Sequence, residues 1–267
     1  LNNKRGEHIQ LNRIGLIYRH LSQFDKAIQS HQQADRLIKE LKDEQAEGTN
    51  LANLGLVYQN MEELEKAKNY FQRAIEINEK FGNTQGIANQ LGNLGLANLG
   101  LGFSDLAKSQ LFKALALHQK LGDKLGQGNQ LGNLGIVFLN NNETELAETY
   151  FQEALKICEQ IGYQNGIGSQ LGNLGELRLA LCQYSEAIIF FEKAIAIQGK
   201  VGNLNHQAEN YQFLGCTHMK LNQFDVAVSK FKLAIEIYQK INPKKITQLE
   251  TLIREATEFS QQEDSSQ

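Results

Sequence analysis

The sequence holds a single proline in 267 residues and no tryptophan. Proline disrupts helix interiors and gathers in loops, so its near absence disfavours a loop-rich fold. Leucine, alanine, glutamine, glutamate and lysine are frequent instead, and these residues have high helix propensity. The composition therefore predicts an almost wholly α-helical chain.

Long apolar runs and basic clusters are also missing. The net charge is −3 without a long basic run, so nucleic acids and anionic membranes have no electrostatic footprint here. No apolar stretch approaches the ~20 residues that a membrane span needs. The first residues, LNNKRGEH, lack the apolar core of a signal peptide. We expect neither a nucleic-acid partner nor a membrane partner.

Cysteine is scarce, and catalytic motifs are missing. The three cysteines follow no metal-ligand spacing, which suits reduced thiols packed as small apolar residues in a cytoplasmic protein. The histidines are scattered, and neither HExxH nor GxSxG occurs. His31 and His218 take positions of aromatic packing residues, so we expect both in the core. The chain is predicted to be no enzyme and to hold no cofactor or metal ion.

What the sequence does have is a repeat of 40 residues. One glycine recurs at this interval, at Gly15, Gly55, Gly95, Gly135, Gly175 and Gly215. Apolar residues at helical spacing before and after each glycine indicate two helices per repeat. Because one helix pair cannot bury its apolar faces alone, the repeats must stack as an α-solenoid. Positions are numbered from this glycine, so that −2 lies two residues before it.

The recurring residues resemble the signature of the tetratricopeptide repeat over six units. In the fourth unit they are Leu131, Leu134, Gly135, Phe138, Ala147, Phe151 and Ala154. The unit is longer than the family's ~34 residues and lacks the proline after its second helix. It is similar to the repeats of Pins-type adaptors, kinesin light chain and bacterial arrays linked to signalling domains. The resemblance implies an all-α, right-handed α-solenoid (superhelix) that mediates protein–protein interaction.

The repeat register also divides the chain. We expect residues 1–7 to be the end of a missing upstream repeat. Six repeats follow at 8–47, 48–87, 88–127, 128–167, 168–207 and 208–242. Residues 243–260 are expected to form a capping helix, and residues 261–267 a disordered tail. The second helix of each repeat is expected to break at a glycine turn such as Gly82-Asn83 or Gly122-Asp123.

The stretch GNQLGNLG, residues 128–135, raises the question of a phosphate-binding loop. A dinucleotide loop needs a preceding strand and GxGxxG, whereas Gly126, Gly128 and Gly132 are spaced GxGxxxG in a helical context. We expect Gly126 in a loop and Gly132 inside a helix, which favours packing over nucleotide binding. Two interpretations stay open for glycines at −3: close approach of a ligand backbone, or contact between helices.

Asparagine recurs at −2, in a ladder of Asn53, Asn93, Asn133 and Asn173. The resemblance implies that this position points into a concave groove and contacts the backbone of a bound peptide. An amide offers both donors and an acceptor, which matches an extended chain. The alternative is that these side chains bond neighbouring repeats and fix their register.

Further candidate groove residues are polar at −6 and mostly apolar at +1 and +4: Asn89, Asn129, Leu96, Ile136, Glu176, Leu99, Leu139 and Leu179. Residues 86–104 and 126–142 carry no charge. This pattern predicts a ligand read through its backbone amides and apolar side chains. Position −3 holds no lysine, which argues against a clamp for a C-terminal carboxylate.

These observations favour a module that binds a peptide or protein segment in its groove, with the partner on another polypeptide or on the same one. The alternatives are a sensor arm of a larger signalling protein, linked to an ATPase or a protease, and a scaffold that associates through its ends. The sequence leaves the oligomeric state open, including an end-to-end dimer.

Overall fold

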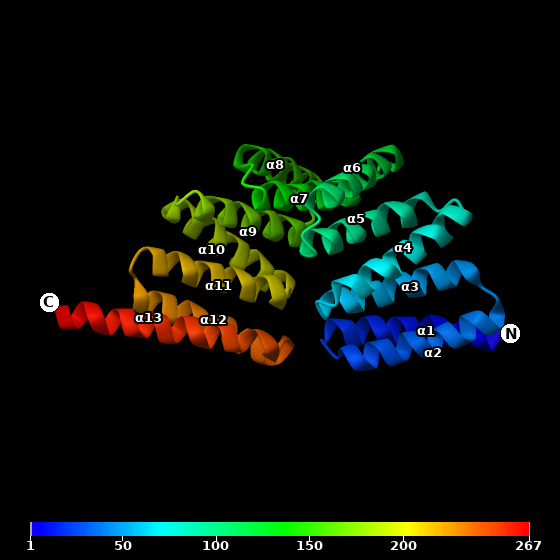
Figure 1. Ribbon diagram of the computed structural model, residues 1–267, viewed down its shortest axis with the longest axis horizontal. Coiled ribbons are helices and arrows are strands. Elements are labelled where there is room, and N and C mark those ends of the chain that lie inside the picture. The colour runs from blue at the N-terminus through cyan, green and yellow to red at the C-terminus, as the bar shows by residue number, and fades with distance from the viewer. Residues whose placement is uncertain (1, 267) are drawn as a thin grey trace. The chain divides into compact units, whose positions relative to one another are not determined.

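The computed structural model describes residues 2–266, and no strand occurs among them. The helices are α1 (Asn2–His20), α2 (Phe24–Leu41), α3 (Glu44–Asn60), α4 (Leu64–Lys80), α5 (Thr84–Gly100), α6 (Ser104–Leu121), α7 (Lys124–Asn140), α8 (Thr144–Gln160), α9 (Gln164–Ala180), α10 (Tyr184–Val201), α11 (Leu204–Lys220), α12 (Phe224–Ile241), the 3₁₀ turn η1 (Pro243–Lys245) and α13 (Ile246–Ser266) (Figure 1). Within this range no helix combines the length and apolar character that crossing a membrane requires.

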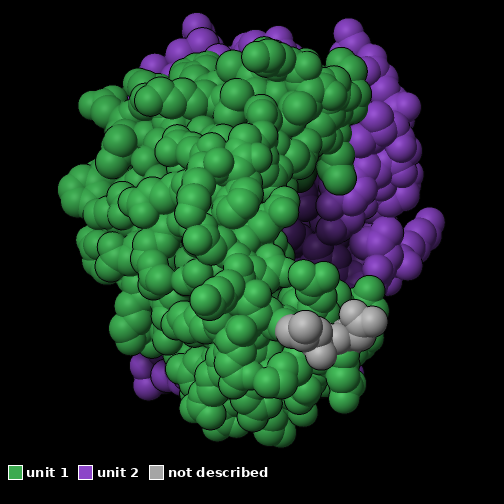
Figure 2. Space-filling model, turned by 90° about the vertical axis from the view of Figure 1, so that its right-hand side faces the viewer, with its two compact units in different colours: residues 1–137 green, residues 138–267 purple. Residues whose placement is uncertain are grey.

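The chain forms two compact units, unit 1 at Leu1–Val137 and unit 2 at Phe138–Gln267 (Figure 2). In unit 1 each helix packs on the next along the chain from α1 to α6, and α3 also contacts α1 and α5. Unit 2 repeats this order from α8 to α13, with a further contact between α9 and α11. From α1 to α12, odd-numbered helices are thus the first helices of repeats, and even-numbered ones are the second. The protein is an all-α solenoid of about six repeats with a C-terminal helix.

The turns follow the same period as the glycines. Within two residues of the end of α2, α4, α6, α8 and α10 stands a left-handed residue, at Lys42, Gly82, Gly122, Gly162 and Gly202, with φ between 54° and 74°. Glycine adopts this conformation without a steric cost, which explains four of the five positions. The predicted break of the second helix at these glycines is confirmed.

The first helices begin at residues 44, 84, 124, 164 and 204, four residues before the expected repeat bounds at 48, 88, 128, 168 and 208. Asn83 and Asp123 cause this early start, because their side chains accept hydrogen bonds from the backbone N–H of Gly86 and Gly126 at 3.0 Å. The expectation that Gly126 lies in a loop is therefore wrong.

The core of each repeat is built around the recurring glycine. Phe71 is fully buried, and a Cβ on Gly55 would lie 2.5 Å from its Cε1 atom. A Cβ on Gly175 would likewise lie 2.6 Å from Phe191 Cε1. Glycine at this position lets the aromatic ring of the second helix reach the backbone of the first. Of the cysteines, Cys158 is buried as expected, whereas Cys182 is exposed and Cys216 is half-buried.

Helices extend to both ends of the described range, α1 from Asn2 and α13 to Ser266. Asn3 and Gly6, which the register aligns with a turn, lie within α1. At the other end α13 continues to Ser266, so residues 261–266 are helical rather than a disordered tail. No glycine or proline interrupts the sequence from Ile246 onward, and the local propensity therefore allows the helix to continue. Gln267 is outside the described residues.

Candidate functional site

The predicted groove residues all lie on first helices. In unit 1, α3, α5 and the first part of α7 carry Asn53, Asn89, Asn93, Leu96, Leu99, Asn129, Asn133 and Ile136, and in unit 2 the end of α7 and α9 carry Leu139, Asn173, Glu176 and Leu179. The two asparagines at −6 are exposed, and the other ten side chains are half-buried. Leu179 also packs against the buried cluster around Phe191, so part of its apolar surface belongs to the core.

The asparagine ladder is held within its own helices. Asn93 Nδ2 donates to Gln90 Oε1 at 3.1 Å, and Asn173 Nδ2 donates to Gln170 Oε1 at 3.1 Å. Asn133 repeats the bond to Gln130 at 3.4 Å. One N–H of the amide is thus occupied at Asn93, Asn133 and Asn173, and the plane of these three amides is fixed. One interpretation of the ladder required bonds between neighbouring repeats, whereas these three bonds lie within single helices.

The glutamines at −5 are site residues that the sequence analysis missed. They are buried although polar, with Gln90, Gln130 and Gln170 exposed by only 8 %, 6 % and 5 %. A Cβ on Gly92 would lie 2.6 Å from Gln130 Oε1, and one on Gly172 would lie 2.7 Å from Asn210 Oδ1. The amide at −5 therefore covers the glycine at −3 of the preceding repeat. At Gly92 and Gly172 the space beside the glycine is therefore filled by a side chain of the next first helix, which favours contact between helices over the approach of a ligand backbone.

The first repeat replaces this arrangement with a buried histidine. His31 is 0 % exposed, as expected, and its Nδ1 lies 2.8 Å from Asn12 Oδ1 and 3.2 Å from Asn50 Oδ1. Burial lowers the pKa of His31 to about 4. Asn50 is drawn toward this ring, so the described part of the chain shows no bond from Asn53 to the residue at −5. His218 differs from the expectation, because it is half-buried and contacts Gln223 Oε1 at 2.7 Å.

Unit 2 carries charges where unit 1 carries none. Burial, together with the charge of Glu209, raises the pKa of Glu176 to about 7. Glu209 itself accepts a hydrogen bond from Lys245 Nζ at 2.9 Å. Arg178 is directed away from this pair: its guanidinium binds Glu148 of α8 at 3.1 Å and Glu186 of α10 at 2.9 Å. Arg178 therefore ties α9 to two second helices.

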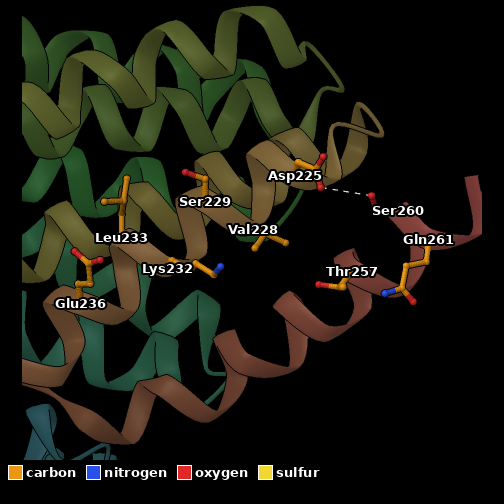
Figure 3. A pocket seen from close by; sticks show the side chains of 9 residues that line it. All are labelled: Asp225, Val228, Ser229, Lys232, Leu233, Glu236, Thr257, Ser260 and Gln261. Atoms are coloured by element: carbon orange, nitrogen blue, oxygen red, sulfur yellow. Dashed lines mark hydrogen bonds between the residues drawn. The ribbon is translucent and has the colours of Figure 1, made fainter. Parts of the chain in front are cut away.

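Neither described cavity coincides with the predicted groove residues. In unit 2 an open cavity of about 700 Å³ lies between α12 and α13 (Figure 3), and Val228, Lys232, Leu233 and Thr257 are among the residues that line it. At one end of this cavity Ser260 Oγ donates a hydrogen bond to Asp225 Oδ1 at 3.4 Å. A second cavity of about 650 Å³ in unit 1 is bordered by α1, the turn before α3 and the end of α4.

The comparisons with known proteins agree with this architecture. The family model described as tetratricopeptide repeat matches residues 8–80, 86–160 and 169–240. The matches cover most of the chain, which therefore belongs to the tetratricopeptide-repeat family. Its members are protein–protein interaction modules, and that is the class of protein defined by this fold. No curated protein sequence matches the chain.

Solved structures share the fold at low sequence identity. A Rap protein complexed with Competence and Sporulation Factor has a TM-score of 0.72 at 14 % identity, and the match covers 98 % of this chain and 77 % of that one. BtubC (BKLC) from P. vanneervenii has a TM-score of 0.61 at 20 % identity, and the match covers 82 % of this chain and 91 % of BtubC. A signal transduction ATPase with a tetratricopeptide repeat sensor, from Pyrococcus horikoshii, has a TM-score of 0.65 at 22 % identity, and the match covers 92 % of this chain and 38 % of the ATPase.

Proposed function

We propose that unit 1 binds an extended segment of a partner protein along the face of its first helices α3, α5 and α7. The observation that carries this proposal is a polar pair repeated every 40 residues: Asn93 is fixed by Gln90, and Asn133 by Gln130. An amide with a fixed plane binds a ligand backbone without the entropic cost of ordering its side chain. Its Oδ1 atom would accept an N–H from the ligand, and its second N–H would donate to a carbonyl.

The surroundings of these amides favour a ligand recognised by its backbone and its apolar side chains. Leu96 and Ile136 lie one turn beyond Asn93 and Asn133 and are half-buried. Residues 86–104 and 126–142 contain no charged side chain, which is unusual for helices with exposed positions. We propose that Asn173 and Leu179 provide a similar surface in unit 2. There Glu176 would favour ligand groups that donate hydrogen bonds or carry positive charge.

The experiment is a selection of binding peptides from a random displayed library with the intact chain as bait. The affinity of each selected peptide is then measured for the wild type and for a variant with Asn89 and Asn129 changed to Ala. Both side chains are exposed and take no part in the pairs between positions −2 and −5; Asn89 accepts only a hydrogen bond of 3.4 Å from Gln85 on its own helix, so this variant leaves the stacking intact. A matched control is Asn69→Ala, because Asn69 is exposed on the second helix α4.

A second variant changes Asn93 and Asn133 to Ala and is compared at equal helicity. The proposal expects the ladder variant to weaken binding roughly tenfold or more, since each lost hydrogen bond costs about 0.5–1.5 kcal/mol. The control should bind like the wild type. Equal affinity of a folded ladder variant and the wild type would place the ligand elsewhere on the protein.

A second candidate function is a regulatory arm of a larger signalling protein. The likeness to the tetratricopeptide repeat sensor of the Pyrococcus horikoshii ATPase favours this candidate, and this chain spans 38 % of that protein. The sequence of the natural polypeptide beyond these residues is the test. An adjoining ATPase or protease domain would support the regulatory arm, and a polypeptide confined to the repeats would contradict it.

A further inference from the structure

The cavity of about 650 Å³ in unit 1 lies where the start of α1, the turn between α2 and α3 and the end of α4 meet. We call it the turn cavity. Its volume is in the range of small-molecule sites, about 300–1,000 Å³. Ile14 and Ile17 stand at the α1 positions that pack on a preceding second helix in other repeats, and neither lines the cavity. The turn cavity is therefore formed by α1 to α4 themselves.

His8 lines the turn cavity and departs from the repeat pattern. Position −7 holds glycine or alanine in the other five repeats: Gly48, Ala88, Gly128, Gly168 and Ala208. Little room is left there, because a Cβ on Gly48 would lie 2.8 Å from Ile77 Cγ2. His8 is only 5 % exposed, and its Nδ1 atom is buried without a hydrogen-bond partner in the described chain. The ring therefore has a hydrogen-bonding group that no described residue uses, which is unfavourable unless a ligand supplies a partner.

Lys42 and Arg5 are two further departures, and both line the turn cavity. Lys42 has a φ of 54°, whereas glycine adopts the left-handed conformation at equivalent turns, as at Gly82 and Gly122. A side chain makes this conformation unfavourable, and such strain gathers at functional positions. Arg5 stands at −10, where the other five repeats have uncharged residues. Neither cation forms an ion pair with a residue of the described range.

The carboxylates of the turn cavity are already engaged. Asp43 accepts a hydrogen bond from the backbone N–H of Ala46 at 3.1 Å and so caps α3. Glu44 forms an ion pair with Lys80. The two unpaired cations are therefore not neutralised by these carboxylates, although the whole chain carries a net charge of −3. A histidine and two cations that the other repeats lack thus gather at one cavity, and this chemistry favours an anion.

We propose that the turn cavity binds a small molecule with an anionic head group, a carboxylate or a phosphate. The guanidinium of Arg5 presents parallel N–H donors to the oxygens of such a group, and the ammonium of Lys42 adds a further donor. The ring of His8 gains the partner that it lacks. Ile9 and Phe81, which are 45 % and 46 % exposed, contact the apolar body of the ligand. None of the predicted groove residues lines this cavity, so the site does not depend on the proposed peptide binding.

The experiment titrates the intact 267-residue chain with phenyl phosphate and with benzoate, and amide NMR spectra report binding. Benzyl alcohol is the neutral control for the apolar body. The main variant is Lys42→Gly, because glycine takes the left-handed conformation of this turn without strain and so preserves the fold. A second variant, Arg5→Gln, introduces the residue type that two other repeats have at −10. Lys120→Gln, at an exposed position of α6, controls for the change in net charge.

The proposal expects at least one of the two anions to bind at millimolar concentration, with shifts at residues 5–9, 41–45 and 80–81. Lys42→Gly and Arg5→Gln should each weaken this binding roughly tenfold, since each removes a hydrogen bond between charged groups. Lys42→Gly should melt no lower than the wild type, which separates a loss of binding from a loss of fold. Lys120→Gln should bind like the wild type. The anion with the higher affinity identifies the head group.

Three results would overturn the proposal. The first is the absence of these shifts with both anions. The second is equal affinity of the wild type and the two folded variants Lys42→Gly and Arg5→Gln, because the anion would then bind elsewhere. The third is equal affinity of the wild type for benzyl alcohol and for the anions, because binding would then rest on apolar contact alone.

Discussion

Glu176 sets up a measurable dependence of stability on pH. Its folded pKa of about 7 exceeds the ordinary value of 4.5, chiefly because the carboxyl is buried and also because Glu209 is near. The unfolded chain therefore releases this proton at a lower pH than the folded protein does. Stability that is fully present below pH ~4.5 is lost as the pH rises toward 7. The full shift corresponds to about 3 kcal/mol, and partial exposure of the side chain reduces this to about 2 kcal/mol.

The perturbation is Glu176→Gln, which keeps the shape of the side chain and removes its ionisation. Urea unfolding followed by circular dichroism gives the free energy of unfolding at pH 5 and at pH 8. At pH 8 the variant should be more stable than the wild type by about 2 kcal/mol, and at pH 5 the difference should fall below about 1 kcal/mol. The higher stability arises because glutamine at this position carries no buried charge.

Glu192→Gln is the control for a general change in net charge, since Glu192 is exposed on α10. It should leave stability nearly unchanged at both pH values. The reasoning fails if Glu176→Gln gives the same difference at pH 5 and pH 8, because a merely structural effect of the amide would not follow the titration. It also fails if the wild type is the more stable protein at pH 8.

Three further changes test unit 1. His31 has a folded pKa near 4, below its ordinary 6.5, so the unfolded chain takes up the proton first as pH falls. Between pH 7 and pH 5 the free energy of unfolding of the wild type should fall by about 2 kcal/mol, whereas His31→Phe should show no such fall. Urea unfolding across this pH range measures both. Gly55→Ala places a methyl group 2.5 Å from Phe71 Cε1. The steric clash outweighs the higher helix propensity of alanine, so the variant should be less stable by about 1–2 kcal/mol and should melt at a lower temperature. Asn83→Ala removes the cap on Gly86 N–H and should cost about 1 kcal/mol, with faster amide exchange in the first turn of α5.

The architecture followed from the sequence because its period is long and regular. A glycine every 40 residues, with apolar residues at helical spacing on both sides, fits only a stack of helix pairs. The turns were predictable at Gly82 and Gly122, where a left-handed residue ends the second helix. Lys42 takes the same conformation without being glycine, and no local signal in the sequence predicts that.

The start of each first helix was less predictable than its centre. Glycines at Gly86 and Gly126 suggest loops by propensity alone. They are helical because a polar residue from the preceding second helix packs there: a Cβ on Gly126 would lie 2.1 Å from His118 Nδ1. His118 also contacts the capping residue Asp123 at 2.8 Å. Tertiary contacts of this kind override local preference, and a single sequence does not display them.

The groove residues were predictable as positions but not as interactions. The asparagine at −2 is visible in the sequence, yet its partner at −5 becomes evident only when burial is known. Gln90 and Gln130 read as surface residues because glutamine is usually exposed. They are buried because their side chains meet the ladder asparagines, and Gln130 also lies over Gly92.

GNQLGNLG thus combines four connected requirements. Its glutamine at −5 reaches back over the preceding repeat, where the glycine at −3 leaves room for it, as Gln130 does over Gly92. The asparagine at −2 satisfies the buried Oε1 atom of that glutamine, since an unpaired buried amide would cost about 1–3 kcal/mol. The final glycine admits the large apolar residue of the second helix, as Gly95 admits Leu111. The glycines at −3 and at the repeat centre therefore accommodate larger side chains from other helices, and the asparagines at −6 and −2 carry the hydrogen-bonding groups that a ligand could reach.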